Sequence, residues 1–301
     1  MAWQKLGRIY EPRAKGPKLT SHAANPLAVH LAGDVYRVFF SGRDAQKRSS
    51  VGWFDLDMAS PRVVAECDGP VFLHGPDGSF YSHGVSVGCC YETAGARYII
   101  FMGWHIPDGG HWRGEIGRLR LDADLSLHLD PERPILAVDA HDPVSLSYPW
   151  VSRVGGHYRM WYGSTSTWDA GNGEMLHVVR QAHSADGQDW KREDNDLPHE
   201  IGVAQAFSRP TVICSHDGSC RMWFSYRSGS GETYCIGHAR SPDGVNWTLD
   251  LDAAGIGVSA SGWDSEMIEY PFVFAHGGQR YMLYNGNGYG LTGIGLAVER
   301  E

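Results

Sequence analysis

Short runs of alternating apolar and polar residues recur along this chain at a nearly constant interval. The runs are VYRVFFSG, RYIIFMGW, HYRMWYGS, SCRMWFSY and RYMLYNGN. Their second residues occupy positions 36, 98, 158, 220 and 281, so the intervals are 62, 60, 62 and 61 residues. Period-2 alternation rich in Tyr, Phe, Trp and Met predicts β-strands. No helical stripe of comparable length intervenes, so the pattern predicts an all-β chain of five repeats.

Each repeat has the same predicted internal order. A short strand comes first, as in NPLAVHL, GVSVGCCY, YPWVSRV, RPTVICS and YPFVFAH, and the aromatic strand follows it. A third strand and a weaker fourth strand come next, and Asp-Gly pairs in the third and fourth repeats predict hairpin turns. Four antiparallel strands repeated radially form the blades of a β-propeller. We therefore predict one domain over residues 1–301, a five-bladed β-propeller with four antiparallel strands in each blade.

The two ends of the chain complement each other in this prediction. The fifth repeat stops after its third strand, and the N-terminal segment WQKLGRIYE has the pattern of a strand. We expect this segment to supply the missing strand and to close the ring, since an unpaired sheet edge promotes aggregation.

Charge and composition restrict the partners. The chain has 26 basic and 35 acidic residues, a net charge of −9 and no basic run, which argues against a nucleic-acid partner. No segment approaches a membrane span, and the N-terminus lacks the apolar core of a secretion signal, so we expect a cytoplasmic protein with no membrane contact. The six cysteines are then expected to be reduced, although Cys214 and Cys220 flank the turn SHDGS and could face each other across a hairpin. The sequence does not indicate an oligomeric state.

Several motifs resemble a known group of enzymes. These motifs are SGRDAQKRSSVGW in the first repeat, HSADGQDW and SPDGVNW in the third and fourth, and YPFVF, YMLYNGN and TGIGLA in the fifth. They resemble the five-bladed propeller glycoside hydrolases and phosphorylases, the group of arabinanases, invertases and mannoside phosphorylases. The resemblance covers all five repeats and is strongest to uncharacterised members associated with polysaccharide or glycoconjugate biosynthesis. It implies a partner that is a small sugar or a glycoconjugate, whereas the fold alone does not imply an activity.

In such a propeller, the first strand of each blade lines a central channel. The loops that follow the aromatic strands reach the same mouth, so polar and aromatic side chains from all five repeats should form a ligand pocket. Tryptophans suit stacking on a sugar ring, and arginines suit a carboxylate, a phosphate or an array of hydroxyls. The predicted substrate-binding residues are Asn25, Arg43, Trp104, His105, Tyr148, Trp150, Trp168, Arg209, Asp264, Tyr270 and Asn287.

The usual catalytic carboxylates of the resembled hydrolases have no match in this chain. Those enzymes place an Asp on the first strand of blade 1, an Asp on blade 2 and a Glu at the head of blade 3. The matching positions here hold Asn25, the run Tyr81-Ser82-His83 and the pair Ser147-Tyr148. Because an asparagine side chain cannot take a proton from water, hydrolysis by the standard route is not expected.

Three other residues are the candidate catalytic groups: Glu269, His83 and Asp44. Burial of Glu269 at the head of the fifth repeat would raise its pKa towards that of a general acid. The alternative is that Glu269 pairs with Arg209 across the channel and serves binding or structure. His83 titrates near neutral pH and could act as acid or base. Asp44, beside Arg43, is expected to stay ionised and to hold sugar hydroxyls.

Neither a cofactor nor a metal is predicted. His83, His105 and His111 belong to one loop system, but no H-x-x-x-H or H-x-H spacing supports a metal site. Two function classes stay open. One is a carbohydrate-active enzyme, and the other is a non-hydrolytic propeller, either a binding module or a recast biosynthetic enzyme such as a transferase, lyase or cyclase.

Overall fold

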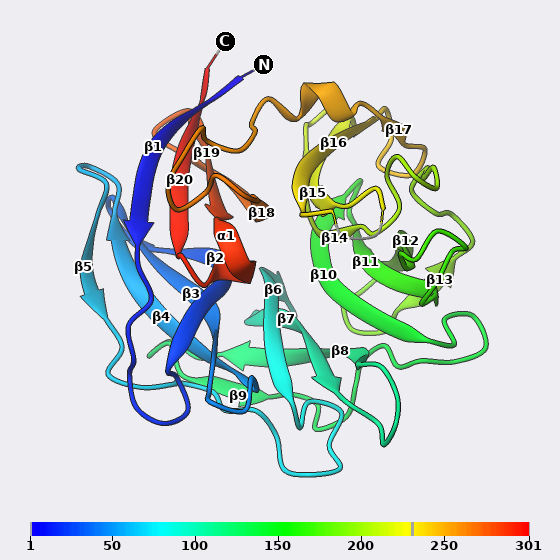
Figure 1. The fold of residues 1–301 in the computed structure, drawn as a ribbon, viewed down its shortest axis with the longest axis horizontal. Helices are drawn as coiled ribbons and strands as arrows, with labels where there is room; N and C mark the ends of the chain where they lie inside the picture. The colour runs from blue at the N-terminus through cyan, green and yellow to red at the C-terminus, as the bar shows by residue number, and fades with distance from the viewer. Residues whose placement is uncertain (1, 230–231, 301) are drawn as a thin grey trace.

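The computed structural model describes residues 2–229 and 232–300, and nearly all of its regular structure is β-strand (Figure 1). The helical segments in these residues are η1 (Leu251–Ala254) and α1 (Asn287–Gly290), each of four residues. The prediction of an all-β chain is confirmed. No helix within the two described ranges has the length and apolar character needed to cross a membrane.

The strands follow one another as five units of antiparallel neighbours. Unit 1 contains β2 (Ser21–Ala32), β3 (Val35–Arg43), β4 (Ser49–Asp57) and β5 (Arg62–Glu66). Unit 2 contains β6 (Gly84–Thr93), β7 (Ala96–His105), β8 (Arg113–Leu121) and β9 (Leu127–Leu129). Unit 3 contains β10 (Ser145–Val154), β11 (His157–Thr167), β12 (Leu176–Ser184) and β13 (Lys191–Glu193). Unit 4 contains β14 (Ser208–Cys214), β15 (Cys220–Tyr226), β16 (Cys235–Ser241) and β17 (Thr248–Leu249). Unit 5 contains β18 (Glu269–His276), β19 (Gln279–Asn285), β20 (Ile294–Arg300) and the N-terminal β1 (Ala2–Tyr10).

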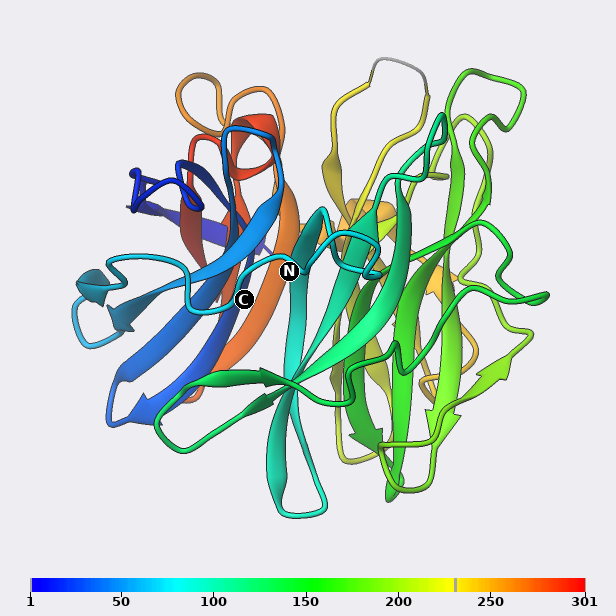
Figure 2. The ribbon, with the colours of Figure 1, turned by 90° about the horizontal axis from the view of Figure 1, so that it is seen from below.

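The units are arranged around a common centre. Figure 1 shows the first strands β2, β6, β10, β14 and β18 nearest to the middle of the view. Units 1 and 2 share one sheet through a single parallel pair, Ser49 with Gly84. Figure 2 shows that α1 and the loops joining β7 to β8 and β11 to β12 project from the same face of the molecule. Side chains from distant parts of the sequence therefore meet at this face.

The second strand of each unit carries the hydrophobic core, as the aromatic alternation predicted. One fully buried large side chain from each of these strands illustrates this: Phe39, Phe101, Trp161, Trp223 and Leu283. Burial of one such side chain stabilises the fold by about 1.5–3 kcal/mol.

Every first strand contains a β-bulge, in which two residues oppose one residue of the second strand. The register with the neighbouring strand skips a pair of residues in all five units, and in unit 2 the skipped pair lies closer to the hairpin turn. The bulged pairs are Asn25-Pro26, Gly88-Cys89, Tyr148-Pro149, Arg209-Pro210 and Tyr270-Pro271. Proline is tolerated there because it has no N–H to donate to the ladder.

The bulges correct the sequence-based placement of the first strands. The X-Pro pairs do not open their strands in units 1 and 3, because β2 and β10 begin before them, at Ser21 and Ser145. In unit 2 the equivalent pair is Gly88-Cys89, so His83 lies outside the repeated bulge. The first bulged residue has a positive φ in the other four units, at Asn25 (56°), Tyr148 (38°), Arg209 (52°) and Tyr270 (53°). Such left-handed backbone at non-glycine residues is uncommon and often marks a functional site.

The quoted motifs HSADGQDW and SPDGVNW form turns rather than a site. Asp186 accepts hydrogen bonds from the backbone N–H groups of Gln188 and Asp189, which hold its pKa at about 2. Asp243 accepts the corresponding bonds from Val245 and Asn246. The two motifs therefore explain local structure and carry no ligand chemistry.

Cys214 and Cys220 form a disulfide with an S–S distance of 1.99 Å. They are register partners at the end of the β14–β15 hairpin, with their Cα atoms 4.1 Å apart. The expectation that all six cysteines are free thiols is therefore wrong for this pair. Sequence spacing did not settle the pairing because it does not define which residues face each other across a hairpin.

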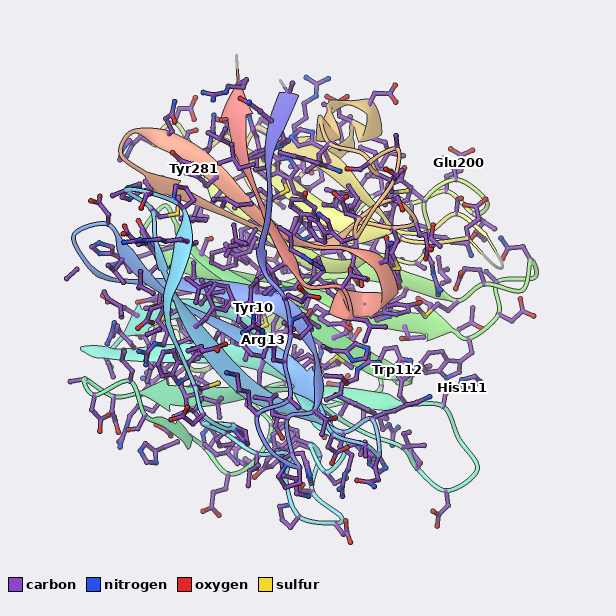
Figure 3. All side chains as sticks on the ribbon, turned by 60° about the vertical axis from the view of Figure 1, so that its left-hand side comes forward. Tyr10, Arg13, His111, Trp112, Glu200 and Tyr281 are labelled. Carbon is purple, nitrogen blue, oxygen red and sulfur yellow. A yellow bond between two sulfur atoms is a disulfide. The ribbon has the colours of Figure 1, made fainter. Side chains whose placement is uncertain are left out.

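The N-terminal strand β1 pairs antiparallel with β20 and joins the sheet of β18 and β19. Trp3 is buried with its ring edge against Trp223 of unit 4, at a centroid distance of 5.7 Å. Tyr10, labelled in Figure 3, stacks on Phe54 of unit 1 at 4.4 Å. One strand thus contacts the hydrophobic cores of two other units.

Deleting residues 1–10 should therefore lower both the melting temperature and the solubility of the protein. The deletion exposes the edge of β20 and removes two buried aromatic side chains, and an open edge pairs with other chains. Thermal melting and analytical size exclusion would measure the two effects. An unchanged melting temperature would contradict a structural role for β1.

Candidate functional site

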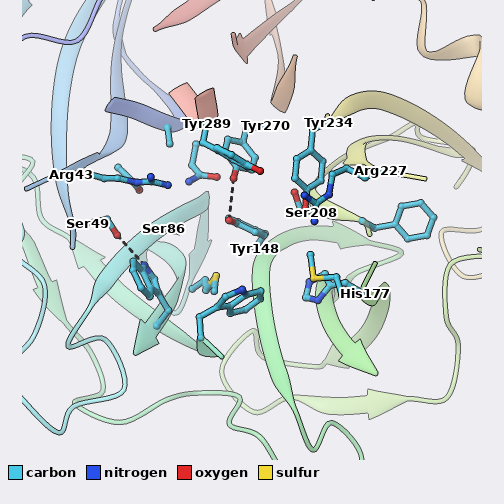
Figure 4. Close-up of a pocket in the computed structure, with 18 of the residues that line it drawn as sticks. Arg43, Ser49, Ser86, Tyr148, His177, Ser208, Arg227, Tyr234, Tyr270 and Tyr289 are labelled. Carbon is cyan, nitrogen blue, oxygen red and sulfur yellow. Dashed lines mark hydrogen bonds between the residues drawn. The ribbon is translucent and has the colours of Figure 1, made fainter. Parts of the chain in front are cut away.

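A cavity of about 380 Å³ lies at the centre of the units (Figure 4). Its walls come from the bulges, from the ends of the second strands and from the loops that follow them. The lining residues are Ala24, Asn25, Ser41, Arg43, Ser49, Ser86, Met102, Trp104, Ile106, Gly110, Trp112, Tyr148, Met175, His177, Phe207, Ser208, Arg227, Tyr234, Tyr270 and Tyr289. We call this cavity the central pocket.

The lining of the central pocket is aromatic, hydroxylic and cationic. It includes two arginines, Arg43 and Arg227, and none of its residues is an Asp or a Glu. Trp104 and Trp112 supply indole faces, which suit stacking on a sugar ring. Such a lining fits a polar ligand with an apolar face.

Arg43, at the end of β3, enters the pocket from unit 1 (Figure 4). Its polar contact is with His22, at 3.5 Å between Nη1 and Nε2. Burial and the Arg43 charge lower the pKa of His22 to about 4, so this imidazole is neutral at neutral pH. The adjacent Asp44 does not neutralise Arg43, because its carboxylate binds Arg48 and the backbone N–H of Gln46.

Arg227 enters the pocket from unit 4, beyond the end of β15. Its Nη2 donates to Oε1 of Glu174 at 2.8 Å, and its guanidinium carbon lies 4.7 Å from the centre of the Tyr234 ring. These contacts hold the guanidinium in a fixed position and compensate part of its charge. A prearranged cation loses little conformational entropy when a ligand binds.

Two tyrosines from opposite units meet in the middle of the pocket. The hydroxyls of Tyr148 and Tyr270 are 3.3 Å apart, as the dashed line in Figure 4 shows. Burial raises the pKa of both phenols, so each keeps its proton and can donate as well as accept. Both residues are the first residue of a bulge, and the bulge turns their side chains towards the cavity.

His177 contributes a neutral imidazole to the wall. Nε2 lies 2.5 Å from Ser147 Oγ, and Nδ1 lies 2.7 Å from Thr165 Oγ1. Complete burial lowers the pKa of His177 to about 3. Because both ring nitrogens already have hydroxyl partners, His177 serves to position the wall of the pocket.

Glu269 lies directly behind the lining, next to Tyr270. Its side chain is completely buried, and neither carboxyl oxygen has a hydrogen-bond partner in the described part of the chain. Burial raises its pKa well above the usual value, and the nearby Arg43 and Arg227 charges oppose this shift without overcoming it. Burial therefore favours the neutral form of this carboxyl group beside the pocket.

Five of the predicted site residues are brought together in the lining. These are Asn25, Arg43, Trp104, Tyr148 and Tyr270. Asn25 is 3% exposed, and its Oδ1 atom has no partner among the described residues.

Three other predicted residues lie near the mouth but outside the lining. His83 contacts Ser82 and accepts the backbone N–H of Ile106 at 3.3 Å. The rings of Trp168 and His111 stack at a centroid distance of 4.6 Å. Figure 3 labels His111 beside Trp112 on the loop before β8. His105, the third of these predicted residues, has a buried Nδ1 atom without a partner in the described residues.

Arg209 has a structural position rather than the predicted ligand contact. It is fully buried, and it donates to the carbonyl oxygens of Gly88 (2.5 Å) and Pro26 (2.7 Å). No ion pair joins Arg209 to Glu269 in the described residues, so the predicted channel-spanning pair is wrong. Burial lowers the pKa of Arg209 to about 10, which leaves it charged at neutral pH.

Four more predicted residues make structural contacts and do not line the pocket. Asp44 is buried, and although burial would raise its pKa, the bonds from Arg48 outweigh this and lower it. Asp264 pairs with Lys5 of β1 at 2.7 Å, and the Asn287 side chain accepts two backbone N–H groups of the loop before β18. Trp150 is buried and donates to Ser152. These residues form turns, strand contacts and core, so we do not retain them in the site.

Most of the lining residues were not predicted from the sequence, and four of these carry polar or aromatic groups central to the site: Arg227, His177, Tyr234 and Tyr289. The repeat itself contained a signal for one of them. Arg43 and Arg227 both follow the repeat positions 36 and 220 by seven residues, so they are equivalent in units 1 and 4. The other three come from loops and strand ends whose approach to the centre depends on the folded ring.

No group of three or more His, Cys, Asp or Glu residues is arranged to hold a metal within residues 2–229 and 232–300.

Comparison with solved structures defines the class of fold. The chain superposes on a glycoside hydrolase with a TM-score of 0.77 at 16% identity, covering 99% of this chain and 91% of that chain. For an endo-arabinase from Bacteroides thetaiotaomicron the TM-score is 0.68 at 11% identity, with 98% of each chain covered. For a member of the mannoside phosphorylase family that contains hydrolases of β-1,2-mannosidic linkages, it is 0.70 at 15% identity, covering 99% and 94%. The fold is therefore that of the propeller glycosidases, and at these identities the likeness concerns fold alone.

Sequence comparison defines the family. The chain is 42% identical over 300 residues to "Uncharacterized protein MT1551" of Mycobacterium tuberculosis, covering 99% of both. It is 41% identical over 299 residues to "Uncharacterized protein Rv1502" from another strain of that species, again covering 99% of both. The chain belongs to the family of these mycobacterial proteins. No protein-family model matches it.

The buried carboxyl of Glu269 predicts a specific pH dependence of stability. Its folded-state pKa is raised, so its stabilising contribution is complete below the unfolded pKa of about 4.3 and is lost as pH rises towards the folded pKa. Glu269→Gln removes this titration. The melting temperature of the variant relative to wild type should therefore increase as pH is raised from about 4.3.

Thermal melts of both proteins across this pH range would measure the difference. Glu266→Gln, at an exposed residue of the loop that leads into β18, is the matched control and should show no such trend. A pH-independent difference for Glu269→Gln would show that Glu269 is ionised in the folded protein.

Proposed function

We propose that residues 1–301 form a single five-bladed propeller, with units 1 to 5 as the blades and β1 as the outer strand of the last blade. Support comes from the bulges in all five first strands and from contacts between successive units. For example, Thr211 Oγ1 donates to the carbonyl of Pro271, and Asn285 Nδ2 donates to the carbonyl of Ala23. The second contact connects unit 5 to unit 1.

We propose further that the protein binds a sugar or glycoconjugate in the central pocket. The observation that carries this proposal is the composition of the lining, in which indole faces, phenol hydroxyls, an unpartnered amide oxygen and two guanidinium groups converge. Sugars present apolar C–H faces and many hydroxyls, which these groups match. The propeller glycosidases with similar folds act on carbohydrates, which agrees with this assignment.

The same lining favours a non-hydrolytic role over standard glycoside hydrolysis. Hydrolysis by inversion or retention uses two carboxyl groups about 5–9.5 Å apart on either side of the bond. The pocket wall contains none, and Glu174, the carboxylate next to it, is bound to Arg227. We therefore propose a sugar-binding protein, or an enzyme whose chemistry does not need a carboxylate pair.

A thermal-shift screen with sugars, glycosides and nucleotide sugars tests sugar binding. A ligand at 100 times its Kd stabilises the folded state by about 2.7 kcal/mol, which raises the melting temperature by several degrees. Tyr148→Phe should weaken the response by a few-fold through loss of one hydrogen bond, about 0.5–1.5 kcal/mol. Tyr281→Phe, outside the pocket, is the matched control. If no carbohydrate in the panel shifts the melting temperature, sugar binding is refuted.

One observation favours a second candidate, an enzyme in which Glu269 donates a proton. General-acid catalysis needs a protonated group, and burial favours the protonated form of Glu269, which adjoins Tyr270 of the lining. For proton donation, the pocket wall would have to open towards Glu269 when substrate binds.

With any substrate that the protein turns over, Glu269→Gln should then lower kcat by about 10²–10⁴-fold. The thermal shift caused by the ligand should persist, because the glutamine preserves shape. Glu266→Gln again serves as the control. An unchanged kcat in Glu269→Gln would rule out the proton donor, and sugar binding would be unaffected by that result.

A further inference from the structure

The charges around the central pocket do not cancel. Three carboxyl groups come near its wall, and each is accounted for by other contacts. Asp44 is bound by Arg48. Glu174 is bound by Arg227. Glu269 is buried without a hydrogen-bond partner among the described residues, and burial favours its neutral form. Two cations thus face the pocket, and only one of them has a bound carboxylate.

Arg43 is the cation without a compensating charge. No carboxylate of the described residues lies within 4.0 Å of its guanidinium, and its side chain contacts the neutral His22. Asp44, its neighbour in sequence, is oriented towards Arg48 instead. An arginine that lines a cavity without an anion is suited to bind a carboxylate or phosphate in a bidentate manner.

Arg227 approaches from the other side of the same cavity. Figure 4 shows Arg43 and Arg227 entering from opposite sides, with Tyr148 and Tyr270 between them. Glu174 and Tyr234 hold Arg227 in place, and its Nε atom has no partner among the described residues. Both cations therefore act on a ligand that occupies the centre.

The groups between the arginines recognise the uncharged part of such a ligand. The Tyr148 and Tyr270 hydroxyls keep their protons, and Asn25 Oδ1 is an acceptor without a partner in the described chain. Trp104 offers an apolar face, with its indole N–H held by Ser49 at 3.1 Å. These contacts select hydroxyl groups, whereas the arginines select a negative charge.

We infer that the ligand of the central pocket is an anionic sugar, one that carries a carboxylate or a phosphate group, with this group bound by Arg43. The inference rests on the proposed sugar-binding function and specifies its substrate class. Sugar binding alone does not require a charged ligand. This inference does, because a neutral sugar leaves Arg43 without a counter-charge.

Binding measurements on matched sugars test this inference. The probes are glucose, galactose and mannose, each compared with its uronic acid and its 6-phosphate, by calorimetry with the full chain. In at least one set an anionic member should bind ten-fold or more tightly than the neutral sugar. The stronger anion identifies carboxylate or phosphate as the natural group. Raising the salt concentration from 50 to 500 mM should weaken binding of the anionic sugar more than that of the neutral sugar.

Variants assign the preference to a residue. Arg43→Met should remove the anionic preference, with a loss of roughly 10- to 100-fold in affinity for the anionic sugar. Arg43→Lys keeps the charge and should retain part of the preference. Arg240→Met, an arginine whose side chain is 68% exposed, is the control and should bind as wild type. The salt dependence of the wild-type protein tests the inference even if a variant does not fold.

The outcomes separate this inference from the proposed function. If neutral sugars bind as tightly as their anionic counterparts in every set, the anionic inference is overturned and sugar binding stands. If no sugar of either kind binds, here or in the wider carbohydrate screen, the proposed function fails as well. If Arg43→Met folds and keeps the anionic preference, Arg43 is not the anion-binding residue.

Discussion

The guanidinium of Arg209 connects three of the five bulges at the centre of the molecule. It belongs to the bulge of unit 4 and donates to carbonyl oxygens in the bulges of units 1 and 2. A buried cation without a counter-ion is costly, and these two bonds satisfy Nη1 and Nη2, whereas Nε has no partner among the described residues. The two bonds therefore restrict how the first strands approach one another. The position of every side chain that a bulge directs to the central pocket depends on that arrangement. Arg209 therefore affects the geometry of the central pocket without lining it.

The bulges bring side chains to the centre of the fold that regular strands would direct elsewhere. A regular strand alternates its side chains between two faces, whereas a bulge places an extra residue and redirects it. Asn25, Tyr148 and Tyr270 reach the pocket in this way, and they do so with left-handed backbone. Glu269 directly precedes the bulged Tyr270 and lies outside the lining. As a result, the phenol lines the cavity and the carboxyl lies behind it.

Much of the fold was predictable because its information is local and repeated. The five aromatic strands, the all-β class and the strand pattern of the N-terminal segment follow from period-2 alternation and a spacing of 60–62 residues. The absence of the expected carboxylates at the matched positions was also visible. The X-Pro pairs were visible as well, but their meaning was not, because a bulge is defined by its register with a neighbouring strand. The register error at His83 in unit 2 has the same origin, since Gly88-Cys89 has no proline to mark it.

The sequence alone determined the composition of the repeats, and with it the kinds of side chain available at the centre. It also contained the equivalence of Arg43 and Arg227, seven residues after the same repeat position. Tertiary structure decided which of these side chains became ligand-facing. Arg209 and Arg43 are both arginines beside the channel, yet one binds backbone carbonyls and the other lines the cavity. Likewise, Asp44 and Asp264 are engaged by Arg48 and Lys5, so that no carboxylate remains in the lining. The reason is physical: charge compensation and burial depend on which groups meet across units far apart in sequence, and no local pattern encodes those distances.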